Sequence, residues 1–298
     1  MCHTPKVWHT FMLSPSTTQL LRFHFSFFLL PVYLFALSQV PAINTTHAVL
    51  IFFILHLLVY PSSNGYNSYM DRDETPIGGV AAPLQPTKQL FYISIIMDAA
   101  AIALSLFVSY WFTFCIAAYI AASRAYSYRG IRLKKYPVIG YLTVIIYQGA
   151  VTYFMVYHGS SINKTLAVPP AGMLAASLLI GGFYPLTQVY QHEADKKDGV
   201  TTISALLGYR GTFIFTAIIY TLAMSILAWW FFTNGEQKKF LALATMMLPI
   251  LVYFFRWAGL VWKDVRTANF TYTMRMNLLA SICTNLAFLT LLIWRVFE

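Results

Sequence analysis

The sequence predicts an all-α polytopic membrane protein, a bundle of about nine transmembrane helices around a central cavity that opens to the cytoplasmic face. Apolar residues make up 58% of the 298 residues, and only 10% are charged. The mean hydropathy is +0.62, so the composition lies outside the range of soluble globular chains. Apolar stretches of about 20 residues, the length that crosses a bilayer as a helix, recur along the chain. We therefore expect an integral membrane protein whose surroundings are the lipid bilayer.

Charged or proline-bearing segments separate the apolar stretches and set the order of the expected helices. Only Ser109 and its neighbours divide the third stretch from the fourth, and the fourth is short, so a count of eight helices is the alternative. No polar stretch is long enough for a separate soluble domain, and we treat residues 1–298 as one domain. The nine expected spans are residues 19–40, 46–63, 89–108, 110–125, 137–158, 168–190, 211–233, 239–262 and 276–296.

The distribution of positive charge predicts the orientation of these helices. With a cytoplasmic N-terminus, the nine spans place 16 of the 20 lysine and arginine residues on that side and leave Lys164, Lys238, Lys239 and Arg295 on the other. Positively charged loops are retained in the cytoplasm, so the asymmetry favours nine spans in an inner or plasma membrane, with the N-terminus cytoplasmic. The net charge of +10 then lies on a face that anionic lipid attracts, and we expect no nucleic-acid partner.

The beginning of the chain and its cysteines add two expectations. The polar start, MCHTPKVWHTFMLSPSTTQ, precedes an apolar run too long for the core of a signal peptide, so we expect the first helix to be retained. Cys2, Cys115 and Cys283 are far apart in the sequence. They suggest neither a disulfide framework nor a thiolate metal site, and we interpret them as packing residues.

Three loops on the expected cytoplasmic side carry clustered polar residues of different character. The loop at 64–88 is acidic and begins NGYNSYMDRDET; the loop at 123–136 is basic and reads SRAYSYRGIRLKKY; the loop at 190–210 is mixed and begins YQHEADKKDG. Carboxylates that face one another across a bundle repel unless cations lie between them. Mg²⁺ prefers oxygen ligands and binds one or two carboxylates together with substrate phosphates. Taken together the loops predict a magnesium-diphosphate site, although any one of them alone is explained as a solvated charged loop.

The spacing of polar residues within the two acidic loops supports this hypothesis. Asn67 and Asp71 are four residues apart, as are Gln191 and Asp195. A spacing of four places two side chains on one face of a helix. Each pair can therefore reach one ion.

These residues carry a resemblance to a known family. The chain resembles the UbiA superfamily of intramembrane prenyltransferases, whose members have nine helices and two acidic signatures, approximately N-x-x-x-D-x-x-x-D and D-x-x-x-D-x-x-x-G. Asn67 and Asp71 match the first two letters of the first signature, and Asp195 and Gly199 match the last two of the second. The segment that follows the family's fourth helix is matched by Tyr126, Ser127, Arg132, Leu133, Lys134 and Pro137.

Two positions depart from the family pattern. Thr75 stands where the first signature has its third carboxylate or amide ligand, and Gln191 stands where the second signature begins. Each acidic site is therefore one carboxylate short. Asp73 and Glu193 are the nearest replacements, and Asp198 is a further candidate.

The resemblance implies a function and a set of site residues. It implies Mg²⁺-dependent transfer of a prenyl group from a polyprenyl diphosphate to a lipophilic acceptor, and it favours weakly an aromatic or quinone-precursor acceptor. Asp71 and Asp195 would be the catalytic carboxylates. The implied metal ligands are Asn67, Asp71, Asp73, Glu193, Asp195 and Asp198. The implied substrate-binding residues are Asn67, Tyr126, Arg132, Lys134 and Lys196, with Lys135 as a further cation and Tyr66 and Tyr69 as further aromatic candidates.

Several other residues are singled out without a settled role. Asp98 is an isolated charge within the third span, and it either has a function or forms an ion pair with Arg22 or Arg256. His192 could transfer protons by its position in the third loop. The Pro76-Ile-Gly-Gly segment could let its loop close as a lid. Three residues before the final helix resemble a weak family feature at the cavity entrance or cap that helix. They are Asn269, Met274 and Asn277.

Two other functions remain open at this level. A transporter would explain the nine helices and Asp98, but transporters bind their substrates near the membrane midplane, whereas the charges here gather at one face. A catalytically weakened family member that binds a prenyl lipid would explain Thr75 and Gln191.

Overall fold

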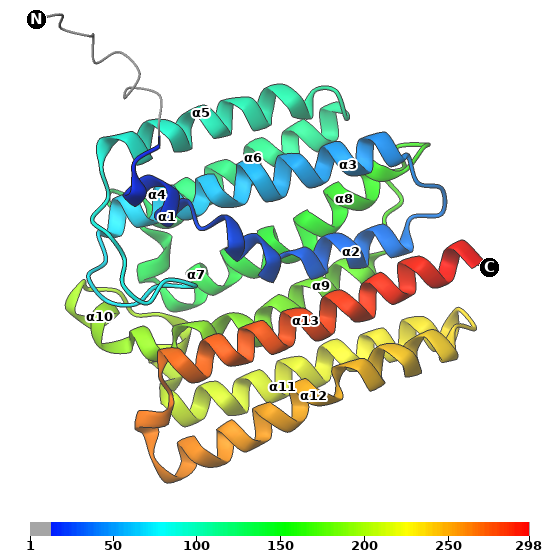
Figure 1. The fold of residues 1–298 in the computed structure, drawn as a ribbon. Helices are drawn as coiled ribbons and strands as arrows, with labels where there is room; N and C mark the ends of the chain where they lie inside the picture. The colour runs from blue at the N-terminus through cyan, green and yellow to red at the C-terminus, as the bar shows by residue number, and fades with distance from the viewer. Residues whose placement is uncertain (1–12, 298) are drawn as a thin grey trace, which may run out of the picture.

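A computed structural model describes residues 13–297, and all of its regular elements are helical apart from two isolated β-bridges. Figure 1 shows long helices packed side by side, with the chain reversing direction at each end of the bundle. The elements are α1 (Pro15–Leu21), η2 (Phe23–Phe28), α2 (Leu30–Gln39), α3 (Thr45–Phe53), η3 (Ile54–Val59), α4 (Tyr60–Asp71), α5 (Lys88–Ser105), α6 (Tyr110–Ser127), η4 (Leu133–Lys135), α7 (Pro137–Val144), η5 (Ile145–Val151), α8 (Thr152–Ser160), α9 (Pro170–Phe183), η6 (Tyr184–Gln191), α10 (His192–Lys197), α11 (Ile203–Thr233), α12 (Gln237–Lys263), η7 (Val265–Thr267), α13 (Phe270–Trp294) and η8 (Arg295–Phe297).

Consecutive elements join into nine helical passes within the described residues, which confirms the predicted fold class. The passes are α1 to α2, α3 to α4, α5, α6, α7 to α8, α9 to α10, α11, α12 and α13 (Figure 1). Eight of these are long and apolar enough to cross a membrane, and α6 is the exception. Its 18 residues include Arg124, three tyrosines and two serines. This polar content keeps the fourth pass below the hydropathy of the others. The structure ends α5 at Ser105 and begins α6 at Tyr110, so the two stretches that Ser109 divides in the sequence are separate helices.

The helical passes extend further into the polar segments than the sequence predicted. The acidic loop was expected at 64–88, yet α4 continues to Asp71, where Arg72 in the left-handed region (φ 54°) ends the helix. The mixed loop was expected at 190–210, yet α10 continues to Lys197 and α11 begins at Ile203. We call the end of the bundle that carries the segments 72–87, 128–136 and 198–202 the polar end. The extensions place the acidic motifs on helix ends, which are more rigid supports than loops.

The acidic segment 72–87 is fastened to the first helical pass. Leu20 and Leu21 of α1 share a small apolar core with Ile77 and Val80. The Arg22 guanidinium donates to Gly78 O at 3.3 Å, on the same segment. The segment therefore lies against α1 beside the bundle, and its closure as a lid stays a prediction.

Asp98 has a different partner from those predicted. Its carboxylate forms an ion pair with Arg124 of α6, not with Arg22 or Arg256. The reason is the antiparallel packing of α5 against α6, which brings the polar half of α6 beside Asp98. Cys115 and Cys283 are buried and free, as expected of packing residues, and Cys2 lies outside the described residues.

Candidate functional site

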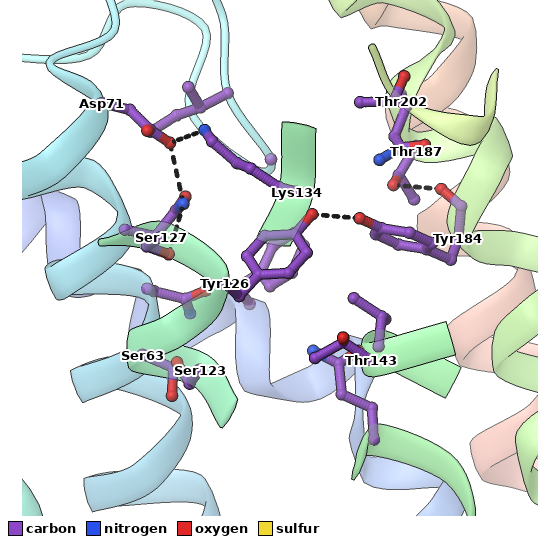
Figure 2. A pocket seen from close by; sticks show the side chains of 18 of the residues that line it. Ser63, Asp71, Ser123, Tyr126, Ser127, Lys134, Thr143, Tyr184, Thr187 and Thr202 are labelled. Atoms are coloured by element: carbon purple, nitrogen blue, oxygen red, sulfur yellow. Dashed lines mark hydrogen bonds and ion pairs between the residues drawn. The ribbon is translucent and has the colours of Figure 1, made fainter. Parts of the chain in front are cut away.

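A cavity of about 220 Å³ lies at the polar end of the bundle. Its walls come from Arg22, η2, α4, the 72–87 segment, α6, η4, α7, η5, η6, α10 and the 198–202 segment. Figure 2 shows Asp71 and Lys134 on one side of it, Tyr184 and Thr187 on the other, and Tyr126 between them. The predicted site residues that line the cavity are Asn67, Asp71, Asp73, Tyr126, Lys134 and Asp195.

Asp71 lies at the end of α4 with cations on two sides. Lys134 forms an ion pair with its Oδ2 atom, and the Arg132 guanidinium lies 3.6 Å from Oδ1. Asn67, one turn earlier, donates from Nδ2 to Asp71 Oδ2 at 2.9 Å and to Ser127 Oγ at 3.1 Å. The Asp71 side chain is only 5% exposed. A buried carboxylate needs such partners because burial of an unpaired charge is costly.

The basic segment connects the two acidic motifs. Arg132 adopts a left-handed conformation (φ 52°) at the start of η4. This conformation lets it reach Asp71 on α4 and also form an ion pair with Asp198 just after α10. Arg129 lies 3.5 Å from the Asp198 carboxylate and donates to Met70 O at 2.8 Å. The acidic, basic and mixed loops of the sequence therefore meet at one place.

Asp73 and Asp195 bring two further carboxylates to the cavity wall. Burial, followed by the charge of Asp71, raises the pKa of Asp73 to about 6, although Lys134 and Arg22 act in the opposite direction. Asp195 is close enough to feel the charges of Asp71, Asp73 and Lys134. Like charges gathered at one buried place disfavour the ionised forms unless a cation joins them.

The residues present fit a bound Mg²⁺ ion that shares its ligands with a substrate. Asp71 Oδ1 and Asp195 Oδ2 are buried oxygens with no hydrogen-bond partner, as expected of atoms that face a cation. Within residues 13–297, no group of three or more histidine, cysteine or acidic side chains is placed to hold a metal by itself. Mg²⁺ commonly completes its shell with water and phosphate oxygens. The set Asn67, Asp71, Asp73 and Asp195 fits that mode.

Other predicted residues lie outside the cavity wall. Glu193 and Lys196 are exposed on α10 and do not line the cavity. Asp198 forms an ion pair with Arg132 and does not line the cavity either. The structure thus brings none of these three to the cavity, and Thr75 is exposed as well. Their direct contact with metal or substrate stays a prediction that the cavity does not support.

Among the aromatic and histidine candidates, some line the cavity and others lie outside it. Tyr126 lines the cavity, whereas Tyr66 and Tyr69 do not. His192 lies with its Nε2 atom 2.8 Å from Ser204 Oγ and its ring against Tyr209. That contact turns His192 toward α11, so it is not placed to exchange protons with a ligand in the cavity.

Sequence reasoning missed Tyr184, Gln148 and Thr187, which also line the cavity. The Tyr184 hydroxyl is hydrogen-bonded to the Tyr126 hydroxyl across it (Figure 2). A signal was present, because Thr187 and Gln188 place two polar residues near the end of an otherwise apolar predicted span, just after Tyr184 and Pro185. Such residues inside a membrane helix mark a functional position by default.

A second, mainly apolar cavity of about 180 Å³ adjoins the first between α2, α9 and α13. The two cavities share the side chains of Phe25, Gln148, Tyr184 and Thr187. Asn277 lies in the wall of the apolar cavity. Asn269 caps α13, because its Oδ1 accepts from Tyr272 N–H, and Met274 lines neither cavity. The combined shape suits a ligand with a charged head and an apolar tail.

A sequence model of the UbiA prenyltransferase family matches residues 26–279. The chain belongs to this family. Solved structures of the family share the fold. A UbiA homolog from Archaeoglobus fulgidus, bound to GPP and Mg²⁺, superposes with a TM-score of 0.66 at 19% identity, over 93% of this chain and 99% of that one. A UbiA homolog from Aeropyrum pernix K1 gives a TM-score of 0.66 at 18% identity, over 90% and 97%.

A digeranylgeranylglyceryl phosphate synthase gives a TM-score of 0.60 at 16% identity, over 93% of this UbiA-family chain and 96% of that one. No curated protein matches the chain. Identities this low show a common fold and leave the substrates of this family member to its own residues.

Proposed function

We propose that this protein catalyses Mg²⁺-dependent transfer of a prenyl group from a polyprenyl diphosphate to a lipophilic acceptor within the membrane. The observation that carries the proposal is the meeting of Asp71, Asp73, Asp195 and Lys134 in a polar cavity that continues into an apolar one. The solved A. fulgidus homolog with GPP and Mg²⁺ supports the choice of ligands. The proposal places the polar end, with its positive segments, on the cytoplasmic side.

The polar cavity binds the diphosphate head group. Asn67, Asp71 and Asp73 would hold Mg²⁺ from one side and Asp195 from the other. An ion held there would supply positive charge that neutralises the diphosphate and favours its departure. Lys134 adds a cation that faces the same space, and Arg132 keeps Asp71 in place. These groups stabilise the negative charge that develops on the leaving oxygen, where electrostatic stabilisation lowers a barrier most effectively.

The reacting carbon lies where the two cavities meet. When its bond to the diphosphate oxygen breaks, the electron pair leaves with the diphosphate and the allylic carbon becomes positive. Tyr184 lies at this junction, and Tyr126, whose hydroxyl bonds to that of Tyr184, lines the polar cavity beside it. Aromatic faces stabilise a cation without attacking it. The acceptor then forms a bond to this carbon and loses a proton to a carboxylate of the wall. The buried position keeps water from capturing the cation.

The acceptor is expected to be an aromatic compound or a quinone precursor, and the polar cavity has hydroxyl and amide groups to orient one. Ser63, Ser123, Thr143 and Gln148 line it beside the charged groups. A family member that binds a prenyl lipid without turnover is the second candidate. Thr75 and Gln191 favour it, because each removes a carboxylate from a family signature.

Binding of geranylgeranyl diphosphate to the purified protein in detergent tests the proposal. We expect the parent to bind with Mg²⁺ and to lose most affinity without it, because the buried carboxylates otherwise repel the diphosphate. Asp71→Asn should weaken Mg²⁺-dependent binding by about 100-fold, as expected for loss of a partner from a buried charged network.

Glu74→Gln serves as the matched control, because Glu74 is an exposed carboxylate on the same segment and should change affinity by less than about two-fold. Binding that is indifferent to Mg²⁺ and to Asp71 would contradict the proposal. Binding without transfer to any of a panel of phenolic and naphthoic acceptors would favour the second candidate.

A further inference from the structure

A buried ion pair outside the cavity joins three helical passes. Asp98 of α5 is 7% exposed, and its carboxylate pairs with Arg124 of α6. Ser62 of α4 lies between them, because Arg124 donates to Ser62 Oγ at 2.8 Å and Ser62 Oγ lies 2.5 Å from Asp98 Oδ1. Each of the three passes therefore contributes one polar group to a single cluster.

The Arg124 guanidinium also lies over an aromatic ring of α4. Its carbon is 4.0 Å from the centroid of the Tyr66 ring, and Tyr66 is 6% exposed. The Nε and Nη1 atoms of Arg124 have no hydrogen-bond partner. Its position thus depends on three groups: Asp98, Ser62 and the Tyr66 ring.

The cluster adjoins the polar cavity through the chain neighbours of its members. Tyr66 precedes Asn67, and Arg124 precedes the stretch that contains Tyr126 and Ser127. The hydrogen bond from Asn67 to Ser127 joins α4 to α6 at the cavity. The ion pair also joins α4 to α6, because Arg124 of α6 contacts Ser62 of α4 directly and Asp98 of α5 contacts both.

A buried ion pair of this kind contributes more to geometry than to stability. Desolvation of two charges offsets most of their attraction, so an apolar replacement is often equally stable. Removal of one partner alone leaves a buried charge that draws in water or moves away. Small displacements of the groups that hold a reacting substrate lower rates steeply.

We propose that Asp98 and Arg124 are positioning residues, which hold the last turn of α4 against α6 so that Asn67 and Asp71 keep the arrangement that binds Mg²⁺ and diphosphate. Neither residue lines the cavity or touches substrate. The role in turnover rests on the proposed function, whereas the role in fixing α4 can be measured without a substrate.

Kinetics of Asp98→Asn provide the first test. We expect kcat to fall by about 10-fold or more and the Mg²⁺ concentration for half-maximal rate to rise several-fold, because the uncompensated Arg124 displaces α4. The double variant Asp98→Asn with Arg124→Gln removes both charges and should recover to within about three-fold of the parent. Glu236→Gln is the matched control and should leave both quantities unchanged. It breaks the ion pair with Lys239 at the start of α12, and the turn between α11 and α12 lies at the opposite end of the bundle from the polar end (Figure 1).

Hydrogen exchange of the α4 backbone over residues 60–71, measured without substrate, provides the second test. We expect faster exchange in Asp98→Asn than in the parent and a return toward parental rates in the double variant. A lower melting temperature with unchanged kcat, Mg²⁺ dependence and α4 exchange would assign the pair a purely structural role and overturn the inference. Absence of transfer by the parent would count against the proposed function, while the exchange result would still decide the position of α4.

Discussion

At the scale of single residues, Asp71 shows how neighbouring groups hold a buried carboxylate in place. Lys134 pairs with its Oδ2 atom, and Asn67 donates a hydrogen bond to the same oxygen. Its other oxygen, Oδ1, lies 3.6 Å from the Arg132 guanidinium and has no hydrogen-bond partner. Under the proposed function Oδ1 is the oxygen that would contact Mg²⁺, on a side chain that its neighbours already orient.

Substitutions at Tyr184 can separate the contribution of its ring to turnover from that of its hydroxyl group. Its hydroxyl bonds to Tyr126, while its ring borders both cavities. We expect Tyr184→Phe to retain turnover within about five-fold, since a hydrogen bond of this kind contributes about 1 kcal/mol. Tyr184→Leu should lower kcat by about 10- to 30-fold, because a cation over an aromatic face gains up to about 2 kcal/mol in a desolvated site. Steady-state rates at saturating diphosphate check this.

Equal losses in the two Tyr184 variants would show that the hydroxyl, not the ring, matters. Thr221→Ala provides a control on α11, because Thr221 is exposed and bonds only to the carbonyl of Ala217 one turn earlier. Its kcat should match that of the parent.

At the scale of elements, the segment 72–87 depends on its attachment to the first helical pass. Gly79 adopts φ 81°, and a Cβ atom there would lie 2.5 Å from Nε2 of His24 in η2. The same His24 nitrogen lies 3.2 Å from Gly79 O. A side chain at this position therefore strains the backbone and also displaces the His24 ring that contacts the segment.

Gly79→Ala is expected to weaken diphosphate binding through Asp73, which the same segment carries. Gly235→Ala is the matched control, since Gly235 has φ 75° with open space around it, in the turn between α11 and α12. Both variants should lose about 1 kcal/mol of unfolding free energy from the positive φ. Only Gly79→Ala should raise the Kd for diphosphate, by about 10-fold, in a Mg²⁺-dependent binding titration. A similar rise in Gly235→Ala would show that the effect is general destabilisation.

At the scale of the whole molecule, hydropathy and charge were sufficient to predict nine passes and the meeting of three polar segments at one end. The number of passes depends on the length of each apolar run, which can be read from that run alone. The meeting of the polar segments follows because successive passes cross the membrane in opposite directions, so every second loop lies on the same side. Asp71 and Asp195 followed from their spacing and from the family signatures, Lys134 followed from the family resemblance, and all three line the cavity. The partner of Asp98 did not follow, because the register between neighbouring helices depends on side-chain packing and not on either helix alone.

The outward position of Glu193 follows from its place on α10. Glu193 and Asp195 are two residues apart on this helix, and residues two apart on an α-helix do not share a face. Because Asp195 lines the cavity, Glu193 points away from it and is exposed. Residues Tyr184–Gln191, which precede α10, form a 3₁₀ helix of eight residues. Pro185 marks where this break begins, but the sequence does not give its length.

The two joined cavities match the two parts of the proposed substrate, its charged head group and its apolar tail, and helices from the whole bundle form them. Ala280 of α13 lines the apolar cavity, so Ala280→Phe would fill much of the space that we assign to the prenyl tail. We expect the Kd for geranylgeranyl diphosphate to rise by about 10-fold or more, since each methylene group kept out of an apolar site costs about 0.8 kcal/mol. Dimethylallyl diphosphate, whose tail is one isoprene unit, should bind within about two-fold of the parental affinity. Ile282→Phe on the exposed face of α13 adds an aromatic ring outside the cavity and should change neither affinity. An unchanged affinity for geranylgeranyl diphosphate in Ala280→Phe would mean that the tail leaves the polar cavity by another route, because only a tail in this cavity meets the new ring. An equal loss for both diphosphates would instead mean that the substitution disturbs the polar cavity, because a loss that comes from the tail depends on chain length.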